Sequence, residues 1–437
     1  MRFLYVLLSY LLTPVVLGFL LWRGARNRAY LERLPERFGF GQHMTQQPCV
    51  WVHAVSVGEI QAASALVRRI LHDFPTLPVT VTTTTPTGAQ RAWDLFGDQV
   101  QHRFAPYDLP GSVARFFDRV VPKVAIIIET ELWPNLYNEC GRRGVPLILA
   151  SARISPLSVG KYRRFVSLFR EALSHGIVIG AQSESDAERF RSLGANPART
   201  FTTGNIKFDF ELPLGTREKG LVLRETHGAN RPVWIAASTH DDEEALVLDA
   251  FETILESAPD ALLILVPRHP ERFRGVGQLL AERGFNYVAR TSNKTCDAST
   301  SVWLIDTLGE LQAIYGAADV AFVGGSLVPV GGHNLLEPAA LGVAVVTGKH
   351  LYNTEDIADM LVREGGVRVV EDSAELAQVV THLLSEKDAR ETMSRAAEQI
   401  IETNRGAVDR LLELISPILT PHAQDDGAAP DEPVLKI

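Results

Sequence analysis

Several polar side chains stand where predicted strands end, and they are of the types that perform acid–base chemistry. The segment His53–Glu59 follows an apolar run and precedes helical periodicity from Ile60. Gly58 has no Cβ and permits close approach of a substrate. Glu59, at a predicted helix start beyond a strand end, is a candidate general base. The alternative is that Glu59 only favours the helix N-terminus, where negative charge is stabilised.

A second acidic pair ends a predicted central strand. Glu129 and Glu131 follow a run of isoleucines, and in extended geometry their side chains face the same way. They could hold a metal ion, share a proton or position hydrogen-bond donors. The remaining alternative is an acidic helix start before Trp133 and Pro134. Because no Asp-x-Asp motif or histidine pair lies nearby, no metal site is predicted.

Cationic residues near other predicted strand ends suit an anionic ligand. Lys207 lies at the end of the first half of the chain, where it can reach into a cleft, although a solvated surface lysine is the alternative. Arg268 and Arg272 follow a predicted strand, and Pro267 and Pro270 fix the turn between them. Two arginines beside a strand end indicate binding of phosphate or carboxylate.

The strongest local signal is a glycine-rich loop. Gly324–Ser326 follows a predicted strand, and Gly331–Asn334 precedes a presumptive helix that contains Glu337. Bare N–H groups at such a helix start can receive an anion, and Glu337 could accept hydrogen bonds from ribose hydroxyls. The spacing matches neither the Rossmann fingerprint nor the P-loop. The combination indicates a nucleotide site, with a tight turn alone as the alternative.

The elements that position these residues alternate between short β-branched runs and amphipathic stretches, which predicts α/β domains with parallel sheets covered on both faces. The predicted strands are 50–56, 79–85, 124–130, 145–151 and 177–183, then 233–238, 262–267, 302–306, 320–324 and 343–347. A polar zone at 211–230 is interpreted as a linker between domains at 23–210 and 231–420. Ligands of such sheets bind beyond the carboxyl ends of the strands, so an interdomain cleft is the expected site. The acidic tail at 421–437 is predicted to be disordered.

Residues 1–22 are predicted to anchor the chain in a membrane. Phe3–Trp22 contains no charged residue and, at about 1.5 Å per residue, would span about 30 Å. Arginines cluster directly after this segment and only Arg2 precedes it, which predicts that the body of the protein is cytoplasmic. A spanning anchor is the favoured interpretation. An in-plane interfacial helix and a core helix of a soluble protein are the alternatives.

The overall composition argues against several other classes of protein. The net charge is −9 and there is no long basic block, which argues against broad nucleic-acid binding. Cys49, Cys140 and Cys296 are far apart, which argues against a disulfide framework or a structural zinc site. Cysteine usage of this kind fits a reducing compartment.

Together these segments resemble the bacterial 3-deoxy-D-manno-octulosonic acid (Kdo) transferases of lipopolysaccharide synthesis. The resemblance extends to about Ile415 and is carried by the motifs Glu36–Gly39, His53–Glu59, Thr84–Gly88, Glu129–Asn135, Pro267–Arg272 and Gly324–Ser326 with Gly331–Asn334. It implies a GT-B fold of two Rossmann-like domains, with the donor nucleotide held mainly by the C-terminal one. The implied reaction is inverting transfer of Kdo from CMP-Kdo to the lipid A precursor lipid IVA, at the cytoplasmic face of the inner membrane.

The resemblance also implies roles for single residues. Glu59 matches the proton acceptor, and Glu129 and Lys207 match transition-state stabilisers; Glu129 is expected to orient Lys207 or to offset oxocarbenium-like charge. The residues that match CMP contacts are Pro267, Arg268, Leu308, Gly309, Glu310, Asn334, Leu335, Leu336 and Glu337. No metal and no cofactor are implied.

Two rival functions stay open, and the entry of the acceptor adds one further expectation. The rivals are a GT-B enzyme that uses a UDP-sugar and a non-catalytic, membrane-tethered protein that binds sugar nucleotides. A phosphorylated lipid acceptor must enter from the membrane side, which predicts a basic rim, with a solvated amphipathic helix as the alternative. The rim residues are Arg33, Arg37, Lys161, Arg163, Arg164 and Arg170.

Overall fold

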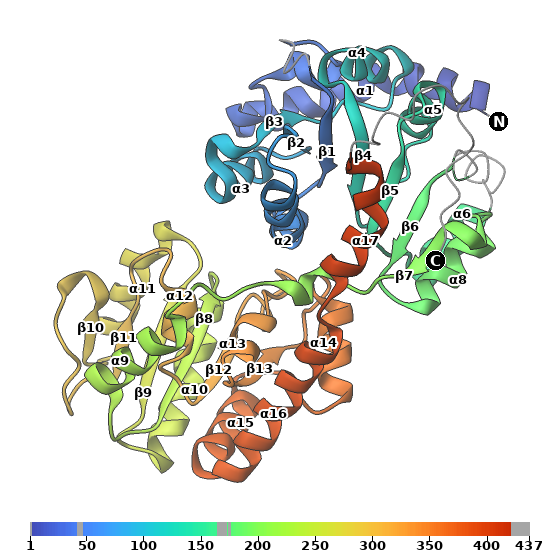
Figure 1. The fold of residues 1–437 in the computed structure, drawn as a ribbon. Helices are drawn as coiled ribbons and strands as arrows, with labels where there is room; N and C mark the ends of the chain where they lie inside the picture. Colours follow the sequence, from blue (N-terminus) through green and yellow to red (C-terminus); the bar gives the residue numbers. More distant parts are fainter. Residues whose placement is uncertain (1, 42–46, 164–172, 174–175, 421–437) are drawn as a thin grey trace. The chain divides into compact units, whose positions relative to one another are not determined.

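The chain forms two compact units, each built around one parallel sheet. The computed structural model describes residues 2–41, 47–163, 173 and 176–420. The first unit comprises residues 1–210 and 405–437, and the second comprises residues 211–404. Each unit has a seven-stranded sheet with helices on both faces (Figure 1). The doubly wound α/β architecture predicted from the sequence is confirmed.

The first sheet has the strand order β3-β2-β1-β4-β5-β6-β7. Its strands are β1 Cys49–His53, β2 Val79–Thr83, β3 Gln101–Phe104, β4 Pro122–Ile128, β5 Leu147–Ala152, β6 Val178–Ala181 and β7 Thr200–Thr202. Val50 of β1 pairs with Val79 on one side and with Val124 on the other. The five inner strands coincide with predicted strands, whereas the two edge strands β3 and β7 were not predicted.

The second sheet has the strand order β10-β11-β9-β8-β12-β13-β14. Its strands are β8 Val233–Thr239, β9 Leu262–Pro267, β10 Tyr287–Ala289, β11 Val302–Leu304, β12 Val320–Val323, β13 Ala344–Gly348 and β14 Val367–Val370. Again the inner strands match the predicted ones and the edge strands β10 and β14 were missed. The inner strands are buried on both faces, so they appear in the sequence as continuous apolar runs.

Helices of the first unit cover both faces of its sheet. They are α1 Arg2–Arg26, α2 Val57–Asp73, α3 Pro86–Phe96, α4 Pro110–Val120, α5 Pro134–Arg143, α6 Pro156–Arg163, α8 Glu184–Ser192 and α17 Ala407–Leu419. Ser56, Thr85 and Ser183 cap α2, α3 and α8, because each side chain accepts a hydrogen bond from an N–H three residues later. These caps start helices directly beyond the carboxyl ends of strands.

Helix α17 corrects the predicted domain boundary. Residues up to 420 were assigned to the second domain, but α17 packs on the first sheet together with α2, through Val408, Leu411 and Ile415 (Figure 1). The carboxylate of Asp209 accepts hydrogen bonds from the backbone N–H groups of Gly406 and Val408, at 2.6 and 2.5 Å. The last helix therefore closes the core of the first unit.

Helices of the second unit include one in the predicted linker. They are α9 Thr216–Gly228, α10 Glu243–Ser257, α11 Pro270–Glu282, α12 Leu311–Tyr315, α13 Leu336–Ala340, α14 Glu355–Arg363, α15 Ser373–Ser385 and α16 Lys387–Asn404. The zone 211–230 was interpreted as a linker, yet most of it is α9, whose Gly220 lies against Gly316 after α12. Glycine there allows the two backbones to approach closely. The predicted disorder of 421–437 falls outside the described residues.

Candidate functional site

Glu59 lies at the start of α2, directly beyond the end of β1. Its carboxylate accepts hydrogen bonds from the Val55 N–H at 2.7 Å and from the Ser56 hydroxyl at 3.2 Å. The Glu59 N–H in turn donates to the Ser56 hydroxyl at 3.4 Å. This reciprocal arrangement is close to a capping box. Glu59 therefore helps to start α2, and these contacts hold its carboxylate at the edge of the sheet.

The surroundings of Glu59 make its carboxyl group a weaker acid. Burial raises its pKa to about 7, and the negative charges of Glu129 and Glu131 act in the same direction. The hydrogen bonds from Val55 and Ser56 oppose this rise but do not cancel it. A carboxyl group with a pKa near neutrality takes up and releases protons at physiological pH, as a general base must.

The acidic pair after β4 does not keep the extended geometry predicted for it. The strand ends at Ile128, and Glu129 adopts a left-handed backbone with φ 58°. Glu131 accepts a hydrogen bond from the indole N–H of Trp133, and burial raises its pKa. The prediction of an extended backbone through Glu129 and Glu131 was wrong because the chain turns at Glu129.

Lys207 pairs with Glu129 in the first unit. The Lys207 Nζ lies 2.7 Å from the Glu129 Oε1, and both side chains are about one quarter exposed, at 28% and 23%. Lys207 is therefore neither a fully solvated surface residue nor a buried one. Glu129 was expected either to orient Lys207 or to offset oxocarbenium-like charge. This ion pair is the geometry that orienting Lys207 requires. Glu59, Glu129 and Lys207 thus come together at the carboxyl edge of the first sheet.

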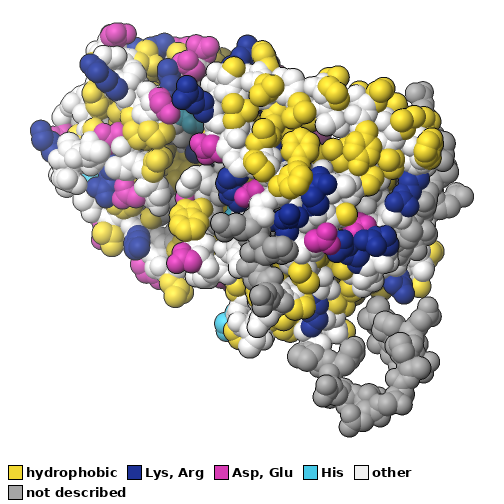
Figure 2. All heavy atoms as spheres, turned by 90° about the horizontal axis from the view of Figure 1, so that it is seen from above, with side chains coloured by type: hydrophobic (Ala, Val, Ile, Leu, Met, Phe, Trp, Pro, Cys, Tyr) yellow, Lys and Arg dark blue, Asp and Glu magenta, His cyan; other side chains and the backbone are white. Residues whose placement is uncertain are grey.

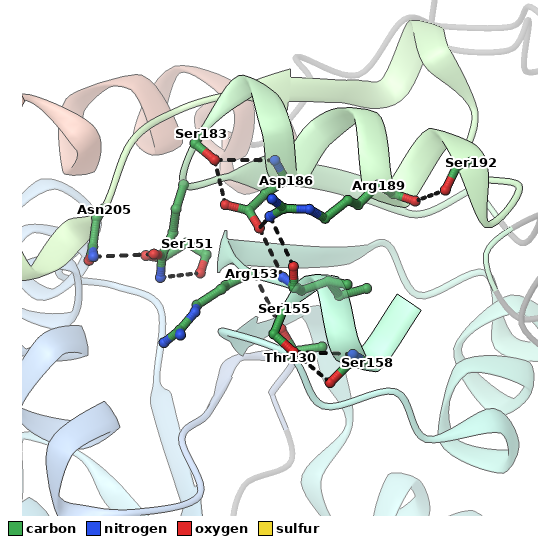
Figure 3. A network of polar contacts seen from close by, with 12 residues as sticks. Thr130, Ser151, Arg153, Ser155, Ser158, Ser183, Asp186, Arg189, Ser192 and Asn205 are labelled. Atoms are coloured by element: carbon green, nitrogen blue, oxygen red, sulfur yellow. Dashed lines mark hydrogen bonds and ion pairs between the residues drawn. The ribbon is translucent and has the colours of Figure 1, made fainter. Parts of the chain in front are cut away.

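A network that sequence reasoning missed holds the segment that carries Lys207 (Figure 3). Ser151, at a register shift in β5, has a left-handed backbone with φ 55°, and its hydroxyl accepts a hydrogen bond from the Ile206 N–H at 3.3 Å. Gln182 donates to the Ser151 carbonyl at 3.1 Å and accepts from the Asn205 amide at 3.2 Å. Asn205 also accepts from the Lys207 N–H at 3.0 Å. A non-glycine residue with positive φ is the structural sign of this site, and no sequence pattern reveals it.

The same network ties the ends of neighbouring strands together (Figure 3). Thr130 accepts a hydrogen bond from the Arg153 N–H at 3.3 Å, which joins the ends of β4 and β5. Asp186 accepts from the Ile154 N–H at 3.0 Å and pairs with Arg189 at 2.9 Å. The loops that carry Glu129 and Lys207 are therefore fixed to the sheet edge by side-chain contacts.

The residues predicted to hold the donor gather at the carboxyl edge of the second sheet. Pro267 ends β9 and is buried, whereas Arg268 and Leu308 are exposed and Leu308–Glu310 lies beyond β11. Glu310 accepts hydrogen bonds from Thr307 at 2.6 Å and from Arg290 at 2.9 Å. The strands β11, β9, β8 and β12 are neighbours, so these loops meet at one edge.

The glycine-rich loop after β12 is held by a buried carboxylate that the sequence analysis did not single out. Glu243 is fully buried and accepts hydrogen bonds from the N–H groups of Gly325, Ser326 and Leu327, at 2.7 to 3.0 Å. It also accepts from the His240 N–H at 3.2 Å. These three loop N–H groups therefore already donate hydrogen bonds within the protein and are not available to an anion.

The helix predicted after the glycine-rich loop is short. It is α13, and the side-chain Oδ1 of Asn334 accepts a hydrogen bond from the Leu336 N–H at 3.0 Å. The Asn334 amide donates to Glu337 at 3.2 Å, while Leu335 is buried. The expectation of bare N–H groups at this helix start is therefore wrong for Leu336. Polar atoms for a ligand come instead from the exposed side chain of Asn334 and the half-buried side chain of Glu337.

The predicted basic rim is corrected at one position. Arg37 is buried at 3% exposure, stacks on the Phe104 ring at 4.2 Å and donates to the Thr84 carbonyl at 2.9 Å. It therefore cannot present its charge to a headgroup. Arg33 is exposed and pairs with Glu36 at 2.8 Å. The side chains of Lys161, Arg163, Arg164 and Arg170 lie outside the described residues. Among the residues that are described, no group of three or more histidine, cysteine or acidic side chains could hold a metal ion.

The raised pKa of Glu59 predicts how its replacement changes stability with pH. The native carboxyl binds its proton more tightly than the unfolded one, so Glu59 loses its favourable contribution as pH rises from about 4.5 to about 7. A Glu59→Gln variant lacks this dependence. Relative to the parent, its free energy of unfolding should therefore rise by about 1–3 kcal/mol between pH 5.5 and pH 8, and its thermal midpoint should rise with it. The exposed Glu188→Gln variant is the control. Parallel curves for the Glu59→Gln variant and the parent would refute the raised pKa.

Comparison with known proteins identifies the relatives of this chain. The family model for 3-deoxy-D-manno-octulosonic-acid transferase (Kdo transferase) matches residues 32–210. A 3-deoxy-D-manno-octulosonic acid transferase of Haemophilus influenzae is 41% identical, over 96% of this chain and 99% of that protein. One of Bordetella pertussis is 36% identical, over 90% of this chain and 94% of that protein.

Solved structures establish the fold. A UDP-N-acetylglucosamine 2-epimerase of Neisseria meningitidis aligns with a TM-score of 0.56 at 12% identity, over 84% of this chain and all of that one. A glycosyltransferase of Rickettsia africae aligns with a TM-score of 0.54 at 14% identity, over 86% of this chain and all of that one. At such identities the likeness shows the fold alone, and the predicted GT-B fold is confirmed. By its identity to relatives that align over nearly their whole length, the chain belongs to the 3-deoxy-D-manno-octulosonic acid transferase family and is a glycosyltransferase.

Proposed function

We propose that this protein transfers Kdo from CMP-Kdo, with inversion at the anomeric carbon, to a hydroxyl of the lipid A precursor lipid IVA. The observation that carries the proposal is the Glu59 carboxyl, whose pKa of about 7 belongs to a base that works at neutral pH. It lies at the carboxyl edge of a parallel sheet, in a chain of the Kdo transferase family. Transfer of Kdo is the reaction of the family to which the chain belongs. CMP-Kdo as donor, lipid IVA as acceptor and inversion at the anomeric carbon are our proposal.

The chemistry of the acceptor needs one base. A sugar hydroxyl becomes a competent nucleophile when its proton leaves, and Glu59 takes that proton as the hydroxyl attacks the anomeric carbon. A single displacement with one base gives inversion. Gly58 precedes the base, is exposed, and meets only the Ser56 hydroxyl within 4 Å of an added Cβ. A substrate hydroxyl can therefore approach Glu59 over bare backbone.

The Lys207 ammonium supports the same step. As CMP leaves, negative charge grows on its phosphate, and a fixed cation stabilises that charge. Glu129 holds the ammonium at 2.7 Å, and the Ser151–Gln182–Asn205 network fixes the backbone beneath it. We assign to Glu129 the orienting role. A preorganised cation costs little reorganisation when the charge develops.

The donor is assigned to the second unit. Arg268 is exposed at the end of β9 and makes no ion pair among the described residues, so its guanidinium suits a phosphate or carboxylate. Leu308–Glu310 and Asn334–Glu337 lie at the same sheet edge and complete the proposed CMP site. The cytoplasmic side of the inner membrane is the proposed location, with α1 as the anchor. That helix is long and apolar enough to cross a membrane.

Product analysis tests the function directly. Purified protein incubated with CMP-Kdo and lipid IVA should yield lipid IVA heavier by one or more Kdo residues in mass spectrometry. CMP should compete with the donor and UDP should not; the reverse order would favour the UDP-sugar alternative. The Glu59→Gln variant should bind CMP-Kdo normally and transfer at least a hundredfold more slowly, the usual order of loss for a general base. Near-normal turnover of that variant would remove Glu59 as the base.

A double-mutant cycle tests the positioning of Lys207. Ser151→Ala removes the hydroxyl that accepts from Ile206, and we expect kcat to fall about tenfold, equivalent to about 1.4 kcal/mol, with the donor KM nearly unchanged. In a Lys207→Ala background the same change should have little further effect, because Ser151 acts through Lys207. An equal loss in both backgrounds would show that Ser151 acts independently of Lys207.

The donor assignment predicts a selective binding defect. Arg268→Ala removes a cation for the donor, and the dissociation constant of CMP-Kdo should rise about tenfold or more, as for a lost charge-assisted hydrogen bond. Arg274→Ala, an exposed arginine on the following helix α11, is the matched control and should leave binding unchanged. Titration calorimetry with CMP-Kdo measures both. Equal affinities for the two variants would place the donor phosphate elsewhere.

A further inference from the structure

The N-terminal helix α1 contacts the first unit near both of its ends. Its less exposed residues recur every three or four positions, which marks one face of a helix. Among them are Tyr5, Ser9, Thr13, Leu17, Leu20 and Gly24, beside Arg2 and Val6 near the N-terminal end. The three hydroxyl-bearing side chains on this stripe lie four residues apart, and those of Ser9 and Thr13 donate to carbonyls of their own helix. At about 1.5 Å per residue the stripe covers most of a helix about 37 Å long.

Polar side chains at the far end of α1 fasten it to the same unit. The Tyr5 hydroxyl donates to Asp108 at 2.8 Å, and the Tyr10 hydroxyl accepts from the Gly111 N–H at 3.3 Å. Arg2 donates to Asn138 on α5. Figure 1 shows α1 lying beside α4 and α5. In a helix that spans a bilayer, these residues would stand about 30 Å from a unit on the opposite side.

The opposite face of α1 is apolar and exposed. Leu4, Leu11, Val15 and Trp22 share that face by helical spacing, and each is exposed by half or more, from 51% to 70%. Figure 2 looks onto this side of the first unit and shows hydrophobic side chains gathered there, with lysine and arginine side chains beside them. Only 6% of the most apolar 18-residue window is buried, which argues against a core helix of a soluble protein. An exposed surface of this kind needs an apolar partner.

We propose that α1 does not cross the membrane but lies in the plane of the cytoplasmic leaflet, docked side-on to the first unit, with its Leu4–Leu11–Trp22 face in the lipid. The in-plane alternative of the sequence analysis is thereby favoured over the spanning one. The reason is geometric: both ends of the helix contact one globular unit, and that unit cannot lie on both sides of a bilayer.

The charge around α1 identifies the partner as a lipid surface. The chain as a whole carries −9, yet the exposed residues Arg23, Arg26 and Arg28 gather at the end of the apolar face. The Arg26 guanidinium covers the Trp22 ring at 4.1 Å and the Arg23 guanidinium stacks on Tyr30 at 5.0 Å. Cations and aromatic rings at the border of an apolar face suit anionic headgroups.

The docking contact also reaches the edge of the sheet that carries Glu59. The Asp108 carboxylate accepts the hydrogen bond from the Tyr5 hydroxyl. It also accepts hydrogen bonds from the N–H groups of Asn135 and Leu136 at the start of α5, at 3.0 and 2.8 Å. Those residues follow β4 and the loop with Glu129. An in-plane α1 therefore brings the lipid surface to the carboxyl edge of the first sheet. Only this last step rests on the proposed function, because a lipid-borne acceptor then approaches the base without leaving the membrane.

Sided labelling tests the topology without any need for activity. A cysteine in a short polar extension before Met1, in a Cys296→Ser background, is exposed to a membrane-impermeant maleimide in spheroplasts and in inverted inner-membrane vesicles. Cys49 and Cys140 are buried and stay. We expect labelling only in inverted vesicles, as for the control Glu188→Cys. Labelling of the extension in spheroplasts would show a spanning helix and overturn the proposal.

Depth measurements provide a second test that does not depend on the extension. Spin labels at Leu4, Leu11 and Trp22 in reconstituted vesicles should all lie at the same depth, about 5–10 Å below the headgroups. A spanning helix would place Leu11 about 15 Å deep and the other two near opposite surfaces. Labels shielded from oxygen at all three positions would mean that protein, such as a second copy of this chain, covers the face, and would also overturn the proposal.

Discussion

The ion pair between Glu129 and Lys207 is the interaction on which the arrangement of the candidate site in the first unit depends. Three carboxylates, those of Glu59, Glu129 and Glu131, influence one another at one sheet edge, and burial raises the pKa of Glu59 and Glu131. The Lys207 Nζ lies 2.7 Å from the Glu129 Oε1 and offsets the charge of that carboxylate. Burial, with a smaller contribution from the charges of Glu129 and Glu131, raises the pKa of Glu59 to about 7, so that its carboxyl group is neither permanently charged nor permanently protonated at neutral pH.

Holding this pair requires unfavourable backbone geometry at two adjacent strand ends. Glu129 and Ser151 both have positive φ, and such residues persist only where their surroundings determine their conformation. For Ser151 the surroundings are Gln182 and the Ile206 N–H; for Glu129, its own N–H still bonds to the Ala150 carbonyl at 3.0 Å. The C-terminal helix α17 contributes through Asp209, which follows Lys207 closely and receives the N–H groups that open α17. Residues far apart in the chain thus stabilise one short segment.

The sequence predicted the inner strands because burial on both faces makes them continuous apolar runs. It missed β3, β7, β10 and β14, all of them edge strands, since an edge strand is short and needs no such run. It predicted Glu59, Glu129 and Lys207 as site residues from type and position. Their contacts depend on a turn at Glu129 and a bulge at Ser151, and neither has a local sequence signature. The assignment of α17 to the second domain failed for a similar reason. Its amphipathic pattern predicts that the helix packs on a sheet but does not indicate which sheet.

Comparison of the two units shows why residue type alone does not define a base. Each unit places a glutamate at the start of the helix that follows its first strand, Glu59 in α2 and Glu243 in α10. Glu243 is fully buried and accepts hydrogen bonds from four backbone N–H groups, so it serves to hold the glycine-rich loop. Glu59 accepts one backbone N–H and one hydroxyl, and faces two other carboxylates. Burial with few donors, beside two other carboxylates, raises the pKa of Glu59, and these surroundings suit Glu59 to take a proton from a substrate.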